Sequence, residues 1–190
     1  MANLEQALNE LFGFEGVYDN NPKDAGGETV FGIARNKHPN LPLWRKIDQL
    51  KVIGWGKNEI AKTILSSKES FMPEIFAFYK NTFWDIFGCD SLPQFVANEI
   101  FEQSVNIGVY HCTRHIQKAV NILNRDQDLW KDIEPDGKPG KNTRDSLIKA
   151  CEKDSKYVYG ILNILQGARY IEIGDEDFIR GWMKRTQWGY

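Results

Sequence analysis

The chain has little cysteine and no long apolar run among its 190 residues. Cys89, Cys112 and Cys151 are too few, and odd in number, for a disulfide-rich scaffold, so we expect three reduced and mostly buried thiols. No apolar run reaches the length of a membrane-spanning helix. Residues 1–11 contain two glutamates and lack a continuous apolar core, so they do not resemble a secretory signal peptide.

The chain also has little net charge. The formal charge is −2 and the isoelectric point is near 6.0, so there is no overall positive field. This argues against nucleic acid as the main partner and gives no support for a polybasic membrane contact. We expect synthesis and folding in the cytoplasm, and a substrate outside the cell would then require another component for delivery.

Apolar and aromatic residues are present in amounts that suit a globular core. Hydrophobic residues make up 42% of the chain and aromatic residues 13%. The length fits one domain or two small ones, and we find neither an internal repeat nor a low-complexity tract. The polar loop 124–141 is the best candidate boundary, but it also fits a surface excursion. We expect a single compact domain over 1–190, with the catalytic motif in 1–90 and a helical part in 91–190.

Apolar residues three and four positions apart predict helices over most of the chain. The first runs from Leu4 to Phe12 and stops at Gly13. Others are expected at 58–65 (capped by Asn58), 69–87 (ended by Gly88), 93–106, 113–123, 142–151, 156–171 and 175–184. Turn residues dominate 15–40, where 29–33 is expected to form one arm of a short hairpin. The sequence therefore predicts a mainly α-helical α+β fold.

Two carboxylates and a hydroxyl follow the first helix at close spacing. Glu15 comes just after the helix, Asp24 nine positions later, and Thr29 after a glycine-rich turn. Helix C-terminal carbonyls and aromatic neighbours would favour the protonated form of Glu15, whereas Asp24 in a polar loop should stay ionised. Such a division suits general acid catalysis of glycoside cleavage. On spacing alone, both are more often ordinary surface residues.

The surrounding residues form a recognisable pattern. Glu15-Gly16-Val17-Tyr18, then Asp24, then the run from Gly26 to Ile33 resemble the signature of glycoside hydrolase family 108. These are N-acetylmuramidases that are also described as secretion activator proteins. Val17 stands where the family motif Glu-Gly-Gly-Tyr has its second glycine. Further matching positions are Tyr79, Trp84, Leu92-Pro93, Val96-Ala97, Asn106-Ile107-Gly108 and His115-Ile116-Gln117, and Glu102 where members usually have Asp.

The resemblance implies a lysozyme-like fold with a small hairpin that carries the active site. It implies hydrolysis of the β-1,4 bond between N-acetylmuramic acid and N-acetylglucosamine, with Glu15 as the acid and no metal or organic cofactor. The spacing also resembles the triad of phage-type lysozymes, in which Asp24 and Thr29 would hold the attacking water and the mechanism would invert. Glu28 competes with Asp24 for that second role.

Substrate-binding candidates come from the matching segments. Tyr18, Tyr79 and Trp84 could stack on sugar rings, although most aromatic residues serve the core. Asn106 could hydrogen-bond an N-acetyl group, or it could tie the central helix to the catalytic loop.

Two C-terminal motifs have competing interpretations. Residues 135–143 resemble the Asp-Gly-x-x-Gly-x-x-Thr turn of peptidoglycan-binding modules, and the family's C-terminal half is described as a predicted peptidoglycan-binding region. Either Asn142 or Thr143 caps the next helix, or the loop contacts the wall, and both can hold. His111 and His115 lie four apart, as in half of a zinc helix, but no third ligand is evident and we expect no metal.

The partners implied are peptidoglycan glycan strands and, for export, a holin-like membrane protein. The protein would act on the cell wall in the periplasm. Two rival interpretations remain open: a non-catalytic peptidoglycan-binding or secretion-associated module with a vestigial cleft, and a phage structural protein with a lysozyme-derived fold.

Overall fold

The computed structural model describes residues 1–13, 16–20 and 27–186. The chain divides into two compact units. We call Leu8–Thr82 the sheet unit, and Met1–Ala7 with Phe83–Tyr190 the helical unit. The divisions fall within α1 (Leu4–Phe12) and within the π-helical turn η1 (Lys80–Trp84).

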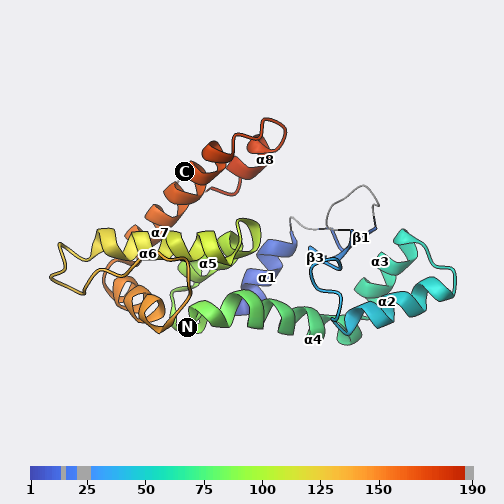
Figure 1. Cartoon of the computed structure of the whole chain (residues 1–190). Helices are drawn as coiled ribbons and strands as arrows, with labels where there is room; N and C mark the ends of the chain where they lie inside the picture. The colour runs from blue at the N-terminus through green and yellow to red at the C-terminus, as the bar shows by residue number, and fades with distance from the viewer. Residues whose placement is uncertain (14–15, 21–26, 187–190) are drawn as a thin grey trace. The chain divides into compact units, whose positions relative to one another are not determined.

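The sheet unit combines a small antiparallel sheet with three helices that follow it (Figure 1). The strands lie in the order β1-β2-β3. The elements are β1 (Tyr18–Asn20), β2 (Glu28–Val30), β3 (Ile33–Ala34), α2 (Leu43–Val52), α3 (Lys57–Ser66) and α4 (Lys68–Tyr79).

The register of the sheet separates its side chains onto two faces. Tyr18 pairs with Val30, which pairs in turn with Ile33, and all three side chains are buried. Asp19 pairs with Thr29 on the other face, and both are half-buried. Because successive residues of a strand point to opposite faces, one face packs into the core and the other is partly open.

A two-residue turn joins β2 to β3. Phe31 and Gly32 both have positive φ angles, 46° and 79°. Such turns match the twist of antiparallel strands, but a bulky residue at the first position is strained. Two contacts hold Phe31 there: the ring of Phe12 lies 4.4 Å away, and the Tyr79 hydroxyl donates to the Phe31 carbonyl at 2.6 Å.

The helical unit is built around three helices. α6 packs along α7, and α5 packs against both. Figure 1 shows α7 from orange to red, and Asp154 interrupts its helical geometry. The elements are η2 (Asp85–Phe87), η3 (Cys89–Ser91), α5 (Gln94–Asn106), α6 (Val109–Leu123), α7 (Lys141–Ile173) and α8 (Ile179–Met183).

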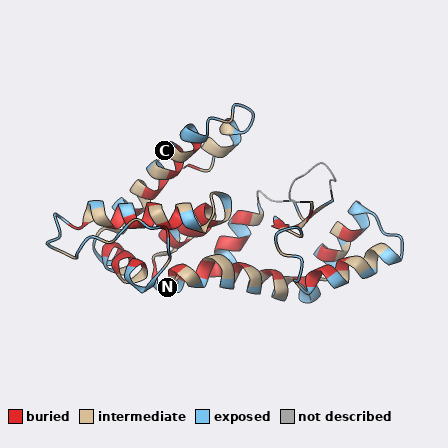
Figure 2. Ribbon diagram, viewed as in Figure 1, coloured by how far each residue is buried: buried red, intermediate tan, exposed pale blue. Residues whose placement is uncertain are grey.

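Buried residues, coloured red in Figure 2, recur along these helices. All three cysteines are free and buried, which confirms the prediction. Within the ranges that the structure describes, no helix is both long and apolar enough to cross a membrane. The predicted mainly α-helical, lysozyme-like α+β fold is confirmed by the many helices and the single small sheet of the described residues.

Several helix boundaries differ from the predictions. The segment α2 was missed, because its buried residues Leu43, Trp44 and Ile47 show only a short apolar stripe. α3 begins after Gly56 and not after the predicted cap Asn58. α6 begins at Val109, because Gly108 with a φ of 83° turns the chain directly from α5 into it.

The other boundary differences concern continuity. The predicted helix 69–87 is α-helical only to Tyr79 and continues as a π-helical and a 3-10 turn. The predicted stop is correct, since Gly88 closes that segment with a left-handed backbone. The predicted helices 142–151 and 156–171 are one element, α7, with a kink at Asp154. α8 is shorter than the predicted helix 175–184.

Candidate functional site

Thr29 is the predicted catalytic residue that the structure places. Glu15 and Asp24 lie outside the described residues. Thr29 lies in the middle strand β2, half-buried on the more open face of the sheet. Its direct cross-strand neighbours are Asp19 on β1 and Ala34 on β3, so its hydroxyl shares a face with a carboxylate.

Asp19 is a carboxylate at this face that no sequence motif indicated. Its Oδ1 accepts a hydrogen bond from Lys57 Nζ on α3 at 2.9 Å. That bond, followed by one from the Asn20 backbone, lowers the pKa of Asp19, so the carboxylate is ionised at neutral pH. Strand alternation could have found it, since Asp19 follows the buried Tyr18.

Glu28 lies on the buried face of the sheet, opposite in direction to Thr29. Its side chain is only 7% exposed. Oε1 accepts from the Tyr18 hydroxyl at 2.8 Å and lies 2.6 Å from Lys51 Nζ, while Oε2 accepts from Arg35 Nη1 at 2.8 Å. Both carboxylate oxygens are therefore occupied by partners from β1, α2 and the segment after β3.

These contacts determine the ionisation of Glu28. Burial acts to raise its pKa, but the hydrogen bonds from Lys51, Arg35 and Tyr18 outweigh burial, and the pKa is lowered. Arg35 also forms two hydrogen bonds of 2.6 Å with Asp48. Burial, together with Glu28 itself, raises the pKa of Tyr18. Glu28 is thus an ionised carboxylate whose two oxygens are both engaged in a structural ion-pair network.

The predicted stacking residues Tyr18, Tyr79 and Trp84 are in the core, with exposed fractions of 4%, 2% and 0%. Tyr18 serves Glu28, and Tyr79 holds the turn at Phe31. Trp84 donates through Nε1 to Asp90 at 2.6 Å. None of the three offers a free ring face on which a sugar could stack, so the structure disagrees with this prediction.

Asn106 lies at the end of α5 in the helical unit and lines a pocket of about 300 Å³. Its Nδ2 donates to the backbone carbonyl of Glu102 and to Glu102 Oε1, the latter at 2.7 Å. Its Oδ1 points to no recorded partner in the described part of the chain. The half-buried Trp182, which the sequence analysis did not select for binding, lines the same pocket. The amide of Asn106 and the ring of Trp182 therefore line the same pocket.

Glu102, the residue beside Asn106, belongs to a buried polar network. Its Oε2 accepts from Gln166 Nε2 at 2.5 Å, and its Oε1 lies 3.2 Å from Arg185 Nη1. Burial raises the pKa of Glu102 despite these partners. Asn106 is thus fixed by its own helix and by Glu102.

The loop 135–143 fastens onto Gln117 of α6. Gln117 Nε2 donates to Asp136 Oδ1 at 2.9 Å and to Thr143 Oγ1 at 3.2 Å. Gln117 Oε1 accepts from the Gly137 backbone at 2.9 Å. The ring of Tyr110 covers Gly137 so closely that a Cβ there would overlap it. Residues 135–143 therefore wrap around the Gln117 side chain, and we call this arrangement the clasp.

The predicted helix cap in this loop is wrong. α7 begins at Lys141, and its N-cap is Gly140, which has an extended backbone and no side-chain capping bond. Asn142 and Thr143 therefore lie inside the first turn. Thr143 bonds Gln117 instead, because its side chain is buried between the loop and α6.

His111 and His115 both lie on α6. Among the residues that the structure describes, no cluster of three or more His, Cys, Asp or Glu side chains could hold a metal ion. His115 Nδ1 is 3.0 Å from Gln103 Oε1 in the buried interior, so one of its nitrogens already has a protein partner.

Comparison with known proteins identifies the family. Residues 8–108, more than half of the chain, match the model of Glycosyl hydrolase 108. Residues 112–187 match the Predicted Peptidoglycan domain. No curated protein matches the chain significantly in sequence.

Among solved structures, the chain is similar in fold to that of Brucella abortus SagA. The TM-score is 0.60 and the identity 21%, over 96% of this chain and 88% of that one. The first family match contains the segment from Glu15 to Thr29, and the second contains the clasp and most of α6 and α7. This chain therefore belongs to the glycosyl hydrolase 108 family.

Proposed function

We propose that this protein hydrolyses the β-1,4 bond between N-acetylmuramic acid and N-acetylglucosamine in peptidoglycan. The observation that carries the proposal is the family match over residues 8–108, which includes Glu15, Asp24 and Thr29. The adjoining match over 112–187, to the Predicted Peptidoglycan domain, supports peptidoglycan as the material on which the protein acts. A wall-bound substrate requires action outside the cytoplasm.

Glu15 acts as the general acid. Breaking a glycosidic bond requires a proton on the leaving oxygen, and a carboxylic acid that stays protonated near neutral pH supplies it. General acid–base catalysis typically contributes about 10²–10⁴-fold in rate. No metal is needed for this step.

Asp24 and Thr29 position the attacking water. The place of Thr29 on the partly open face of β2 supports this role, because its side chain points away from the core. A water held there would attack the anomeric carbon on the face opposite to the acid and invert its configuration. NMR of fresh product would show inversion as immediate release of the α-anomer, whereas release of the β-anomer would contradict the single-displacement mechanism.

Two other carboxylates serve as controls for Asp24. We expect Asp24→Asn and Thr29→Val to lower the rate of glycan cleavage by at least about tenfold, since the first removes the negative charge that polarises the water and the second removes a hydrogen bond to it. Glu28→Gln should retain the rate in its folded fraction, because Glu28 is occupied by Tyr18, Arg35 and Lys51. Asp19→Asn, which changes the carboxylate that faces Thr29, should also cleave. Loss in Asp19→Asn with retention in Asp24→Asn would move the water-positioning role to Asp19.

The bond that is cut is tested by product analysis. Purified peptidoglycan is incubated with the protein, and the soluble fragments are reduced and examined by mass spectrometry. We expect fragments that end in reducing N-acetylmuramic acid. Fragments that end in reducing N-acetylglucosamine would identify a glucosaminidase, and wall binding without any soluble fragment would favour the non-catalytic module.

A further inference from the structure

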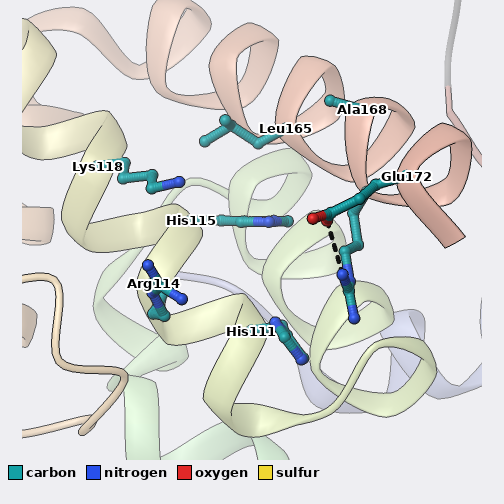
Figure 3. Close-up of a pocket in the computed structure, with 8 residues that line it drawn as sticks. His111, Arg114, His115, Lys118, Leu165, Ala168 and Glu172 are labelled. Atoms are coloured by element: carbon teal, nitrogen blue, oxygen red, sulfur yellow. Dashed lines mark hydrogen bonds and ion pairs between the residues drawn. The ribbon is translucent and has the colours of Figure 1, made fainter.

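A second cavity of about 360 Å³ lies in the helical unit, between α6 and α7 (Figure 3). Four of its side chains extend from α6 and the others from α7, which crosses opposite. The residues that line it are His111, Arg114, His115, Lys118, Leu165, Ala168, Arg169 and Glu172. All of these lining residues belong to the helical unit.

Positive charge dominates the α6 side of this cavity. His111, Arg114, His115 and Lys118 are spaced three, four and seven positions apart, so they form one stripe along the helix. Arg114 and Lys118 form no ion pair with any residue in the described ranges, and the Nε of Arg114 is buried without a hydrogen-bond partner. Two cationic side chains of α6 therefore face the cavity without an ion pair among the described residues, although Glu172 of α7 also lines it.

The α7 side contributes one neutralised pair. Arg169 Nη1 lies 2.6 Å from Glu172 Oε2, the ion pair dashed in Figure 3. Glu172 is 71% exposed and Arg169 only 29%. Lys118 also acts electrostatically on Glu172, but one carboxylate among three lining cations leaves the cavity with an excess of positive charge.

His115 supplies a hydrogen-bond acceptor beside these cations. Gln103 Nε2 donates to Glu99 Oε1 and to the Leu162 carbonyl, which fixes Oε1 of Gln103 as the acceptor for His115 Nδ1–H. Burial, followed by the neighbouring Lys118, lowers the pKa of His115 to about 4. The ring is therefore neutral at pH 7, with the proton on Nδ1 and a lone pair on Nε2.

We propose that this cavity binds a carboxylate of the peptidoglycan stem peptide, with Arg114 and Lys118 on the carboxylate and His115 Nε2 accepting an adjacent amide N–H. The proposal rests on the proposed function, because it assigns the peptide part of the same substrate to the helical unit. A peptide presents carboxylates and amide N–H groups close together, and the cavity presents the matching donors and acceptor.

The neighbouring pocket supports a peptidoglycan fragment as the occupant. The pocket that Asn106 and Trp182 line also includes His111 and Arg169, so the two cavities adjoin. An amide whose Oδ1 has no partner among the described residues, beside an aromatic surface, suits an N-acetyl sugar. The cations of the adjoining cavity suit the peptide that such a sugar carries. A phosphate polymer would use the cations but would have no amide N–H for His115.

The first test is a calorimetric titration of the full-length protein with a synthetic stem pentapeptide that carries free carboxylates. The ligand control is the same peptide with every carboxyl group amidated, titrated into the same wild-type protein. We expect the free-acid peptide to bind and the amidated peptide to bind at least about tenfold more weakly, since charge-assisted hydrogen bonds are lost. Equal binding of both peptides would overturn the proposal.

The second test compares two charge-matched variants. Arg114→Gln/Lys118→Gln removes two cations from the cavity, and Lys149→Gln/Lys153→Gln removes two exposed cations of α7 that do not line it. We expect binding of the free-acid peptide to weaken at least about tenfold in the first variant and to stay unchanged in the second. Equal loss in both variants, or tighter binding of poly(glycerol phosphate) than of the peptide, would contradict the assignment.

Cleavage of peptide-free glycan chains separates this proposal from the proposed function. Arg114→Gln/Lys118→Gln should cleave such chains as fast as the wild type, because the peptide is absent. If the wild type cuts no glycan, the muramidase assignment fails while the titration still decides the cavity. If glycan is cut but the stem peptide does not bind, only the cavity assignment fails.

Discussion

Glu28 is a carboxylate within the catalytic motif whose surroundings give it a structural role. Two cations and a phenol occupy both of its oxygens. Its lowered pKa means that the folded state keeps Glu28 ionised at a pH where the unfolded chain begins to bind a proton. The stabilisation it provides is therefore present above the unfolded pKa, near about 4.3, and is lost as the pH falls through the folded pKa.

We expect Glu28→Gln to lower the free energy of unfolding at pH 7 by about 1–3 kcal/mol, because Arg35 and Lys51 lose their buried partner while keeping some solvent contact. Urea denaturation at pH 7 and at pH 3 measures this. The deficit should shrink at the lower pH, and Glu69→Gln, an exposed carboxylate of the same unit, should show no deficit. An equal deficit at both pH values would mean that the charge of Glu28 is not what stabilises the fold.

Glu99 on α5 has the opposite pH dependence. Burial, with a smaller effect from Glu102, raises the pKa of Glu99 to about 7, although hydrogen bonds from Gln103 and Asn163 act against this. The folded state thus holds a proton that the unfolded chain has already lost, and the free energy of unfolding falls as the pH rises from about 4 to 7.

We expect Glu99→Gln to remove most of that decline, so that the variant is more stable than the wild type by about 1–3 kcal/mol at pH 8 and similar to it at pH 5. Thermal unfolding followed across this pH range tests it. Glu152→Gln, an exposed site on α7, is the matched control and should follow the wild type. A wild-type stability that increases steadily from pH 5 to pH 8 with no difference from Glu99→Gln would show that Glu99 is ionised throughout.

Residue types alone could not separate core aromatics from binding aromatics. Tyr79 and Trp84 belong to matching segments and were chosen for that reason, yet Tyr79 holds a strained turn and Trp84 fills the helical core. The partner of each side chain comes from a distant part of the chain or from an irregular segment. Trp182, by contrast, reaches a pocket only because the C-terminal segment returns to α5 and α7.

At the scale of elements, the clasp around Gln117 explains why the loop 135–143 has a glycine at position 137. Gly137 has a φ of 75°, a left-handed conformation, and lies under the ring of Tyr110. The guanidinium carbon of Arg114 also lies over the Tyr110 ring, 5.8 Å from its centroid. The loop therefore holds the first turns of α6 and, through Tyr110, positions Arg114, which lines the basic cavity between α6 and α7.

Gly137→Ala should destabilise the protein by about 2–4 kcal/mol, from backbone strain at positive φ and overlap with Tyr110. Gly140→Ala is the matched control three positions away. Its φ is −89° and a Cβ there would meet nothing within 4 Å, so its cost should stay below about 1 kcal/mol. Chemical denaturation of both variants decides this, and equal costs would contradict the role of the clasp.

Helices with a clear apolar stripe could be predicted from the sequence, and their exact starts could not. The stripe of α5 predicted its extent almost to the residue, because both ends have backbone signals, Pro93 and the Asn106-Ile107-Gly108 turn. α2 is not evident in the sequence because its five polar residues outnumber its three buried ones. The caps Asn58 and Thr143 were wrong, since preceding glycines already provide the extended N-cap backbone.

For the whole molecule, the fold class and the family follow from the sequence, whereas the roles within the site depend on three-dimensional neighbours. The outward direction of Thr29 follows from the alternation of side chains along a strand. The structural role of Glu28 becomes evident only from its ion pairs with Arg35 and Lys51, which come from later parts of the chain. The basic cavity is an intermediate case. Its α6 stripe can be read from the sequence, but the facing α7 residues cannot.

The rate at which reducing ends are released from purified peptidoglycan by the wild type and by Glu15→Gln tests the central claim most directly. The account predicts a loss of about 10²–10⁴-fold in Glu15→Gln with unchanged thermal stability, because the amide cannot donate a proton to the leaving oxygen. Cleavage by Glu15→Gln at the wild-type rate would contradict the account and place the general acid elsewhere in the chain.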